Sequence, residues 1–226
     1  MDNDESLNNP PLLTERGSGV EATPLSAGKG KGDRLVIIKY NAGNIRSVLF
    51  ALERIGVRAD VTDDAEEILS ADKIIFPGVG EASTAMEYLR QRNLDEVIRA
   101  AKQPLLGICL GLQLLCKHSE ENDVTCLGVF DARVKKFVSN ELKIPQIGWN
   151  TIRPAQNKLF KNVPDNSYCY FVHSYYAALV PETIATTVYA NEFSCALNKN
   201  NFYGVQFHPE KSAEAGEQIL KNFLAL

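Results

Sequence analysis

The sequence predicts an α/β fold: one three-layer α/β/α domain whose parallel sheet carries antiparallel extensions. Short apolar runs alternate with helical patterns up to about residue 117, which is the order of parallel strands joined by crossover helices. Six strand-like segments and a single helix then follow, as expected for antiparallel additions to the same sheet or a small second sheet. A content of 45% hydrophobic and 23% charged residues is that of an average globular domain.

The first half of this domain begins at Arg34 and alternates strands with helices. Its apolar runs are typical of strands that are buried in a parallel sheet. Asn44 is a favourable N-cap for the first helix, and Gly56 stands where that helix should end. The expected strands are 35–38, 57–61, 73–76 and 105–108, and the expected helices are 45–55, 64–69, 82–102 (continuous or broken in two) and 110 to about 117.

The second half changes character, because turn signals separate its segments and helical patterns become rare. Its expected strands are 129–138, 146–152, 168–173, 184–189, 194–198 and 202–206, followed by a helix over 213–224.

Residues 1–33 differ from both halves. They are rich in glycine, contain no aromatic residue and show no apolar face. This composition predicts a disordered N-terminal extension, which leaves residues 34–226 as the folded domain. We interpret the extension as dispensable, or as the result of a start codon assigned too far upstream; a docking tail is the functional alternative.

Charge and composition argue against several classes of protein. A net charge of -4 is unusual for a dedicated nucleic-acid-binding protein, which is usually basic. There is no apolar run of about 18 residues and no signal-peptide pattern, so we expect neither a membrane protein nor a secreted one. The five cysteines include no Cys-x-x-Cys pair and indicate free thiols in a reducing, cytoplasmic compartment. The three histidines lack the local spacing of a zinc site, and we expect no metal.

The strongest motif is Gly107-Ile108-Cys109-Leu110-Gly111, between an expected buried strand and an expected helix. This is the arrangement of a nucleophile elbow with cysteine in place of serine. The two glycines allow a tight, strained turn that lifts the cysteine above the carboxyl edge of the sheet. The helix behind it favours the thiolate, and the backbone N–H of Leu110 can stabilise an oxyanion. A lone free cysteine is more often structural, but this context favours a nucleophile.

A second motif, His208-Pro209-Glu210, directly follows the last expected strand. A cysteine nucleophile needs a base that passes its proton to a leaving amine, and His208 can do this. Glu210 can orient the imidazole and stabilise its charged form. Alone, the tripeptide is a weak signal and fits a surface loop with an incidental acid. Together with the elbow it predicts a triad of Cys109, His208 and Glu210.

A third motif, Pro77-Gly78-Val79-Gly80, ends the third expected strand. Its two glycines allow peptide groups to point an N–H at a ligand, and neighbouring strand ends share one crevice. Val79 and Gly80 are therefore candidates for a second oxyanion donor, with an ordinary strand-to-helix turn as the alternative. The same freedom predicts that a peptide here can turn over, so that a carbonyl faces the site at rest and an N–H faces it when active.

These motifs resemble the class I glutamine amidotransferases, whose Cys–His–Glu triad hydrolyses the side-chain amide of glutamine. The similarity spans residues 34–226 and is greatest to glutaminase subunits of imidazole glycerol phosphate synthases. It is carried by segments 40–48, 77–80, 148–150, 170–175 and 208–212. The resemblance implies a flavodoxin-like fold, no cofactor, and a role in histidine biosynthesis. It also implies a heterodimer with a (β/α)8-barrel synthase subunit that receives ammonia through a tunnel.

The resemblance further implies which residues hold glutamine. Gln113 matches the residue that binds the amino-acid end, and Gly80 and the main chain near Ser174 match further contacts. His173 lies near the site by the same comparison, with a structural role as an equal alternative.

Two departures from the family pattern concern the partner rather than the triad. Lys39-Tyr40-Asn41 ends the first strand, and Gln146 stands where histidine is common; we expect both to affect the partner interface. Three other functions stay open: the glutaminase of another amidotransferase such as pyridoxal phosphate synthase, a Cys-elbow peptidase or chaperone, and a noncatalytic scaffold. Segments 77–80 and 148–150 weigh against the first. His208-Pro-Glu210 and Gln113 weigh against the second, and the complete triad weighs against the third.

Overall fold

The computed structural model describes residues 34–41 and 44–226, so the predicted N-terminal extension lies outside the described residues. Within them, 13 strands form one mixed sheet with the order β2-β1-β3-β4-β13-β12-β10-β7-β5-β6, and β11, β8 and β9 branch from β12. The strands are β1 (Leu35–Ile38), β2 (Asp60–Thr62), β3 (Lys73–Gly78), β4 (Leu105–Cys109), β5 (His118–Ser119), β6 (Val124–Thr125), β7 (Arg133–Lys136), β8 (Gln146–Pro154), β9 (Ser167–His173), β10 (Tyr175–Ala177), β11 (Thr183–Tyr189), β12 (Asn191–Lys199) and β13 (Phe202–Val205).

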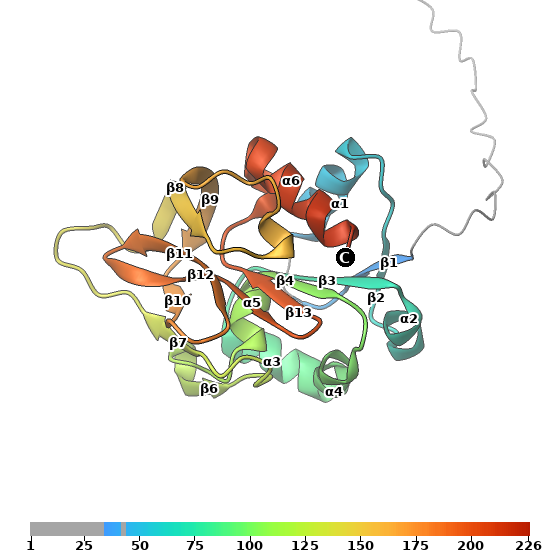
Figure 1. Ribbon diagram of the computed structural model, residues 1–226. Helices are drawn as coiled ribbons and strands as arrows, with labels where there is room; N and C mark the ends of the chain where they lie inside the picture. Colours follow the sequence, from blue (N-terminus) through green and yellow to red (C-terminus); the bar gives the residue numbers. More distant parts are fainter. Residues whose placement is uncertain (1–33, 42–43) are drawn as a thin grey trace, which may run out of the picture. The chain divides into compact units, whose positions relative to one another are not determined.

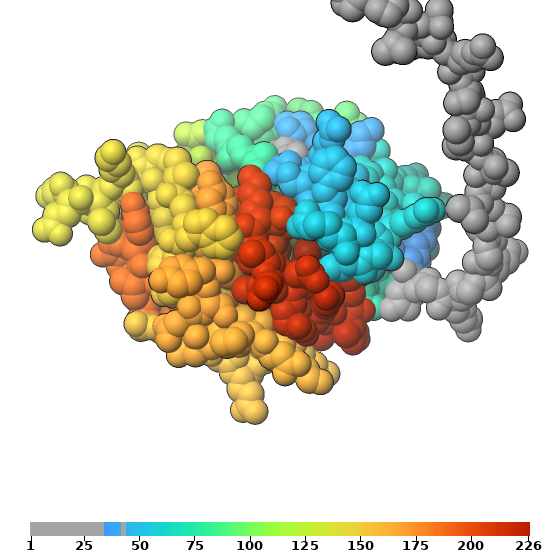
Figure 2. Space-filling view, turned by 90° about the horizontal axis from the view of Figure 1, so that it is seen from above, coloured from blue at the N-terminus to red at the C-terminus, as the bar shows by residue number. Residues whose placement is uncertain are grey.

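The five strands from β2 to β13 in this order are parallel, and helices cover both of their faces. In Figure 1 one face carries α1 (Ile45–Arg54) and α6 (Ala213–Leu224), which come from opposite ends of the described chain. Figure 2 shows the same two helices side by side from above. The other face carries α2 (Ala65–Ser70), α3 (Ala82–Gln91), α4 (Leu94–Ala100) and α5 (Leu110–Leu115). This is the predicted three-layer α/β/α fold.

Two hydrophobic cores follow from this layering, one on each face of the sheet. Successive residues of a strand point to opposite faces, so Ile38 and Phe76 pack in the core beneath α3 and α5. Ile37 and Ile75 pack in the core beneath α1 and α6. Burial on both faces explains why the parallel strands are continuous apolar runs rather than alternating ones.

The parallel strands also place the candidate site. Gly78 pairs with Cys109 across β3 and β4, and Val205 pairs with Ile108 across β13 and β4. The carboxyl ends of these three strands therefore meet at one edge of the sheet. The three motifs selected from the sequence follow these strand ends.

The elements of the second half are antiparallel additions, as predicted. β12 pairs antiparallel with β13, β11 and β10. β8 and β9 form an antiparallel pair in which Gln146 lies opposite His173 and Trp149 lies opposite Tyr170. The predicted strands mostly differ from these by one to three residues at their ends, but the first, expected over 129–138, shortens to β7.

The second strand, expected over 57–61, is wrong at its start. The N–H of Gly56 donates to Glu53 and that of Val57 donates to Leu52, with Gly56 at φ 75°. This is a Schellman cap, so Val57 belongs to the end of α1. The start of the same helix also differs, because Asn44 does not cap it through its side chain but accepts a hydrogen bond from the Ser47 hydroxyl at 2.8 Å.

The helix after the elbow is shorter than the expected 110–117. The N–H of Lys117 donates to Ala132 beside β7 rather than to its own helix, so α5 ends at Leu115. The segment 82–102 is two helices, separated at Asn93, whose φ is 56°. Across residues 34–41 and 44–226, none of the helices is long and apolar enough to cross a membrane.

Candidate active site

Cys109 occupies the sharp turn from β4 into α5. Its backbone has φ 54° and ψ -107°, a conformation that non-glycine residues rarely adopt and that often marks functional sites. A Cβ at Gly111 would overlap the carbonyl oxygen of Phe76, and one at Gly107 would lie 2.8 Å from the backbone of Gly111. The two glycines thus let α5 approach β3 and β4 closely enough to form the turn that the motif predicts.

The Cys109 sulfur lies among polar groups although the residue is only 6% exposed. Its thiol lies 3.8 Å from the carbonyl oxygen of Val172, and the Nε2 of Gln206 donates toward the sulfur at 3.7 Å. An amide donor facing the sulfur stabilises negative charge on it. Gln206 was not selected from the sequence, because its role depends on a contact between β4 and the end of β13.

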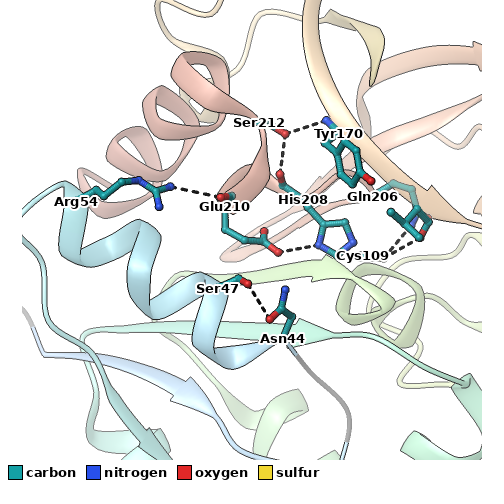
Figure 3. A network of polar contacts seen from close by, with 10 residues as sticks. Asn44, Ser47, Arg54, Cys109, Tyr170, Gln206, His208, Glu210 and Ser212 are labelled. Atoms are coloured by element: carbon teal, nitrogen blue, oxygen red, sulfur yellow. Dashed lines mark hydrogen bonds and ion pairs between the residues drawn. The ribbon is translucent and has the colours of Figure 1, made fainter. Parts of the chain in front are cut away.

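His208 lies between Glu210 and Cys109, as Figure 3 shows. Its Nδ1 donates to Oε1 of Glu210 at 2.8 Å, and both side chains are almost completely buried. Burial alone would lower the pKa of His208, but contact with the Cys109 sulfur and the hydrogen bond and charge of Glu210 raise that pKa to about 10. The imidazole is therefore held in its charged form, with its other nitrogen free to serve Cys109.

Backbone contacts fix the turn that carries His208 and Glu210. The N–H of His208 donates to the carbonyl of Tyr170 at 2.9 Å. The hydroxyl of Ser212 donates to the carbonyl of His208 at 2.6 Å and accepts from the N–H of Tyr170 at 3.0 Å. Arg54 donates to the carbonyl of Glu210 at 3.4 Å. These contacts join β9 and α1 to the turn (Figure 3), so the histidine cannot shift independently of the sheet.

A cavity of about 310 Å³ opens in front of these residues, close to the lower limit of small-molecule sites. Glu210 lies behind His208 and does not line it. Every other residue selected from the sequence for this site lines the cavity: Val79, Gly80, Cys109, Leu110, Gln113, Ser174 and His208. The cavity is also lined by Glu121, Pro145, Val172, His173, Tyr175 and Lys211.

Gln113 is fixed at one wall of the cavity. Its Nε2 donates to the carbonyl of Tyr175 and to Oε1 of Gln206, both at 3.0 Å. Both amide hydrogens are thereby used, which leaves the carbonyl oxygen as the group that can accept from a ligand. This geometry suits the role that the family resemblance implies, an acceptor for the ammonium of an amino acid.

Glu121 is a candidate ligand-binding residue that the sequence did not reveal. It lies in the 3-10 turn Glu121–Asp123, and its Oε2 accepts from the N–H of Ala82 at 2.7 Å. Burial raises the pKa of Glu121, the Ala82 N–H lowers it, and the charge of Glu81 raises it further. A lone acid after a two-residue strand carries no sequence signal, since only the fold brings it to the cavity.

His173 is held in a neutral, structural state at the cavity wall. Its Nδ1 lies 2.7 Å from the carbonyl of Tyr175 and its Nε2 lies 3.0 Å from the side-chain amide of Gln146. Burial and the charge of His208 lower its pKa to about 4, although the Tyr175 carbonyl works in the opposite direction. Gln146 is itself 3% exposed, so its side chain does not present the partner contact that the sequence suggests.

The loop after β3 is the loosest part of the site. Val79 is 40% exposed, and a Cβ at Gly80 would have no atom within 4 Å. Gly80 has φ 105°, which glycine adopts at little cost. The loop lines the cavity together with His208, and a second N–H donor is predicted from it.

The described residues offer little else that is reactive. No group of three or more His, Cys, Asp or Glu among them is arranged to hold a metal. The five cysteines are all buried and unpaired.

Comparisons with known proteins agree on one family. Residues 36–226 match the family described as Glutamine amidotransferase class-I. The chain is similar to "Imidazole glycerol phosphate synthase subunit HisH" of Bacteroides thetaiotaomicron, with 53% identity over 195 residues, 85% of this chain and 100% of the relative. It is 55% identical to the protein of that name from Bacteroides fragilis and 48% identical to that from Yersinia pseudotuberculosis, over 85% of this chain and 100% and 99% of those proteins.

Solved structures agree on the fold. A putative GMP synthase protein from Thermoplasma acidophilum aligns with a TM-score of 0.66 at 20% identity, over 85% of this chain and 93% of that chain. PurLQS from Thermotoga maritima aligns with a TM-score of 0.65 at 18% identity, over 86% of this chain and 98% of that chain.

Proposed function

Because this chain belongs to the class-I glutamine amidotransferase family, we propose that it hydrolyses glutamine to glutamate and ammonia as the glutaminase subunit of an imidazole glycerol phosphate synthase in histidine biosynthesis. Relatives at 48% to 55% identity over nearly their whole length carry the name of that subunit. The observation that supports the chemistry best is the position of His208, buried between Glu210 and Cys109 at the wall of one cavity.

Cys109 acts as the nucleophile and His208 as the proton carrier. The thiolate attacks the carboxamide carbon of glutamine, and the imidazolium donates its proton to the departing ammonia. A glutamyl thioester on Cys109 remains. His208, now neutral, takes a proton from water, and the resulting hydroxide attacks the thioester to release glutamate. Glu210 keeps the ring oriented and stabilises its charged form throughout.

Two peptide groups stabilise the oxyanion of both tetrahedral intermediates. One is the N–H of Leu110, at the first position of α5, and the other comes from the Val79–Gly80 loop at the cavity wall. Each such donor typically contributes about 100- to 1000-fold to turnover. Because the loop is open, the second donor is the adjustable one.

The amino-acid end of glutamine binds at the wall formed by Gln113 and Glu121. Glu121 supplies the negative charge for its ammonium, and the carbonyl oxygen of Gln113 supplies a neutral acceptor. The main chain near Ser174 borders the same space. A pyridoxal phosphate synthase subunit, a peptidase and a chaperone are not favoured, because relatives at 53% and 55% identity share the histidine-biosynthesis name along their whole length.

The ammonia is used by a partner, since free ammonia would be protonated in water and lost as a nucleophile. The relatives' names indicate a subunit of a larger synthase, and the partner is a (β/α)8 barrel that receives ammonia through a tunnel. Its docking face is the exposed side of β8 and β9, where Ile147, Trp149 and Tyr168 are 64%, 53% and 62% exposed. Ile147 pairs with Val172, which lines the cavity, so this face adjoins the site.

The test uses the full chain together with the synthase subunit of the same organism. Cys109→Ser should lower glutamine-dependent synthesis by about 10⁴-fold or more, because a hydroxyl is a far weaker nucleophile here. Synthesis from added ammonium salt should continue, since that route bypasses the triad. Substantial glutamate release by the variant would remove Cys109 from its role. Absence of any glutamate release by the wild-type complex would refute the function.

A further inference from the structure

Tyr40 carries a buried hydroxyl group that nothing in the structure explains. The residue follows β1, is 6% exposed, and its ring lies 5.3 Å from that of Phe76. Among the described residues, its hydroxyl has no hydrogen-bond partner. Burial, and after it the nearby Cys109, raise the pKa of Tyr40 well above its ordinary value, so the phenol stays a donor. Buried polar groups without a partner are rare and often relate to function.

The hydroxyl lies at the root of the adjustable loop. A Cβ on Gly78 would overlap it, and that Cβ would also lie 2.8 Å from Leu110 Cβ and 2.9 Å from the Gly111 nitrogen. The phenol therefore packs against the Cα of Gly78, beside the first turn of α5. Tyr40 does not line the glutamine cavity, whereas Val79 and Gly80 do. The hydroxyl is thus behind the loop, on the side away from the substrate.

Turning over the peptide between Gly78 and Val79 exchanges the directions of its N–H and its carbonyl. When the Val79 N–H faces the cavity to stabilise the oxyanion, the Gly78 carbonyl must face away from it. A carbonyl directed into a buried region needs a donor. The Tyr40 hydroxyl is an unused donor placed on that side.

We propose that Tyr40 is a positioning residue whose hydroxyl is unpaired at rest and donates to the Gly78 carbonyl when the peptide between Gly78 and Val79 turns over. This inference rests on the proposed glutaminase function and names a group that stabilises its active state. The hydrogen bond exists in only one of the two loop states, so it shifts the population toward the active one. Tyr40 makes no contact with substrate and does not act on the reacting atoms.

The experiment compares Tyr40→Phe with wild type in the complex with the synthase subunit and its acceptor nucleotide. Loss of one neutral hydrogen bond should lower the kcat for glutamine hydrolysis about 3- to 10-fold, with KM unchanged within about twofold. Tyr203→Phe is the matched control, because it removes a phenol near the start of β13, away from the strand ends that form the site, and should leave kcat unchanged.

Three further measurements separate positioning from packing. The rate at which a diazo-ketone analogue of glutamine alkylates Cys109 should be unchanged, because the nucleophile and the glutamine site are intact. Synthesis from ammonium salt should also be unchanged. The melting temperature of the isolated variant should equal or exceed that of wild type, because a hydroxyl without a partner at rest has been removed.

Two results would overturn the inference. One is a kcat for Tyr40→Phe equal to that of wild type in an active complex, which would leave the glutaminase function standing. The other is a fall in kcat accompanied by a lower melting temperature and slower alkylation of Cys109, which would show that the phenol only fills space. A wild-type complex that releases no glutamate would instead refute the proposed function itself.

Discussion

The two walls that hold the oxyanion are built in opposite ways. On the elbow wall, the backbones of α5, β3 and β4 approach so closely that a single added carbon at Gly107 or Gly111 would overlap backbone atoms. On the loop wall, Gly80 has open space around it and Val79 is partly exposed. Both walls use glycine, but the elbow uses its small size and the loop uses its conformational freedom.

The difference indicates how the site divides its tasks. The nucleophile, the Leu110 donor and the His208 turn are fixed by packing and by hydrogen bonds to β9 and α1. The second oxyanion donor is on the wall that can move. A glutaminase that waits for its partner needs such a division, since a partner can select a loop state more easily than it can rebuild a packed elbow.

The largest effect is expected from the fixed half. Glu210→Gln removes the charge that holds His208 in its charged form, and should lower the kcat for glutamine hydrolysis by about 10³-fold. The pKa of His208 should fall at the same time, which the pH dependence of alkylation at Cys109 will report. Glu217→Gln is the control, since Glu217 pairs with Lys221 on the surface of α6. A Glu210→Gln complex with normal turnover would contradict the triad.

A pair of alanine substitutions tests the comparison of the two walls directly. Gly111→Ala forces a methyl group into the Phe76 carbonyl and should destabilise the fold by about 3 kcal/mol, because backbone cannot give way. Gly80→Ala meets no atom and should cost about 1 kcal/mol from its unfavourable φ. Thermal unfolding measures both. Gly80→Ala should nevertheless blunt the stimulation of glutaminase by the partner. Equal stability losses, with stimulation unaffected, would mean that the walls do not differ as described.

Sequence reasoning found the parts of the site whose signal is local. The elbow shows itself because Gly107 and Gly111 flank Cys109 between a strand and a helix. The His208-Pro209-Glu210 turn shows itself through its residue types. The resemblance to a known family added Gln113, and the structure places all of these around one cavity or directly behind its wall.

The missed parts depend on contacts between distant segments. Glu121 reaches the cavity only because α3 packs beside its turn, and Ser212 matters only because β9 lies next to His208. β5 and β10 have two and three residues, too few for a pattern to show. The start of β2 was misplaced because Val57 completes the cap of α1, through a bond to Leu52 that apolar patterning does not reveal.

The two buried histidines should give the fixed half a characteristic pH dependence. The pKa of His208 is raised from 6.5 to about 10, so its charged form contributes stability that is complete below pH 6.5 and lost as the pH rises through 10. The pKa of His173 is lowered from 6.5 to about 4, so its neutral form contributes stability that is present above pH 6.5 and lost as the pH falls through 4.

Melting temperatures across this range will check the assignment. Relative to wild type, His208→Gln should flatten the alkaline limb of the profile, and His173→Gln should flatten the acid limb. Exchanged effects, with His173→Gln acting on the alkaline limb, would show that the charged and neutral histidines have been assigned the wrong way round.

The smallest effect is expected from a region outside both walls. The relatives align end to end with 85% of this chain, and the composition of residues 1–33 predicts no packed face. A chain that begins at Arg34 should melt within about 2 °C of the full chain and should be stimulated equally by the partner. A decrease of several degrees, or loss of partner binding, would show that the extension contributes to the fold or to the complex.

The most direct test of the proposed mechanism is to locate the covalent intermediate. The complex is mixed with glutamine, quenched in acid during turnover and digested, and the peptides are analysed by mass spectrometry. We expect one glutamyl group, as a thioester on Cys109, which forms faster in the complex than in the isolated chain because the loop donor is then in place. Glutamate released with no adduct on Cys109, or with the glutamyl group on another residue, would contradict the mechanism.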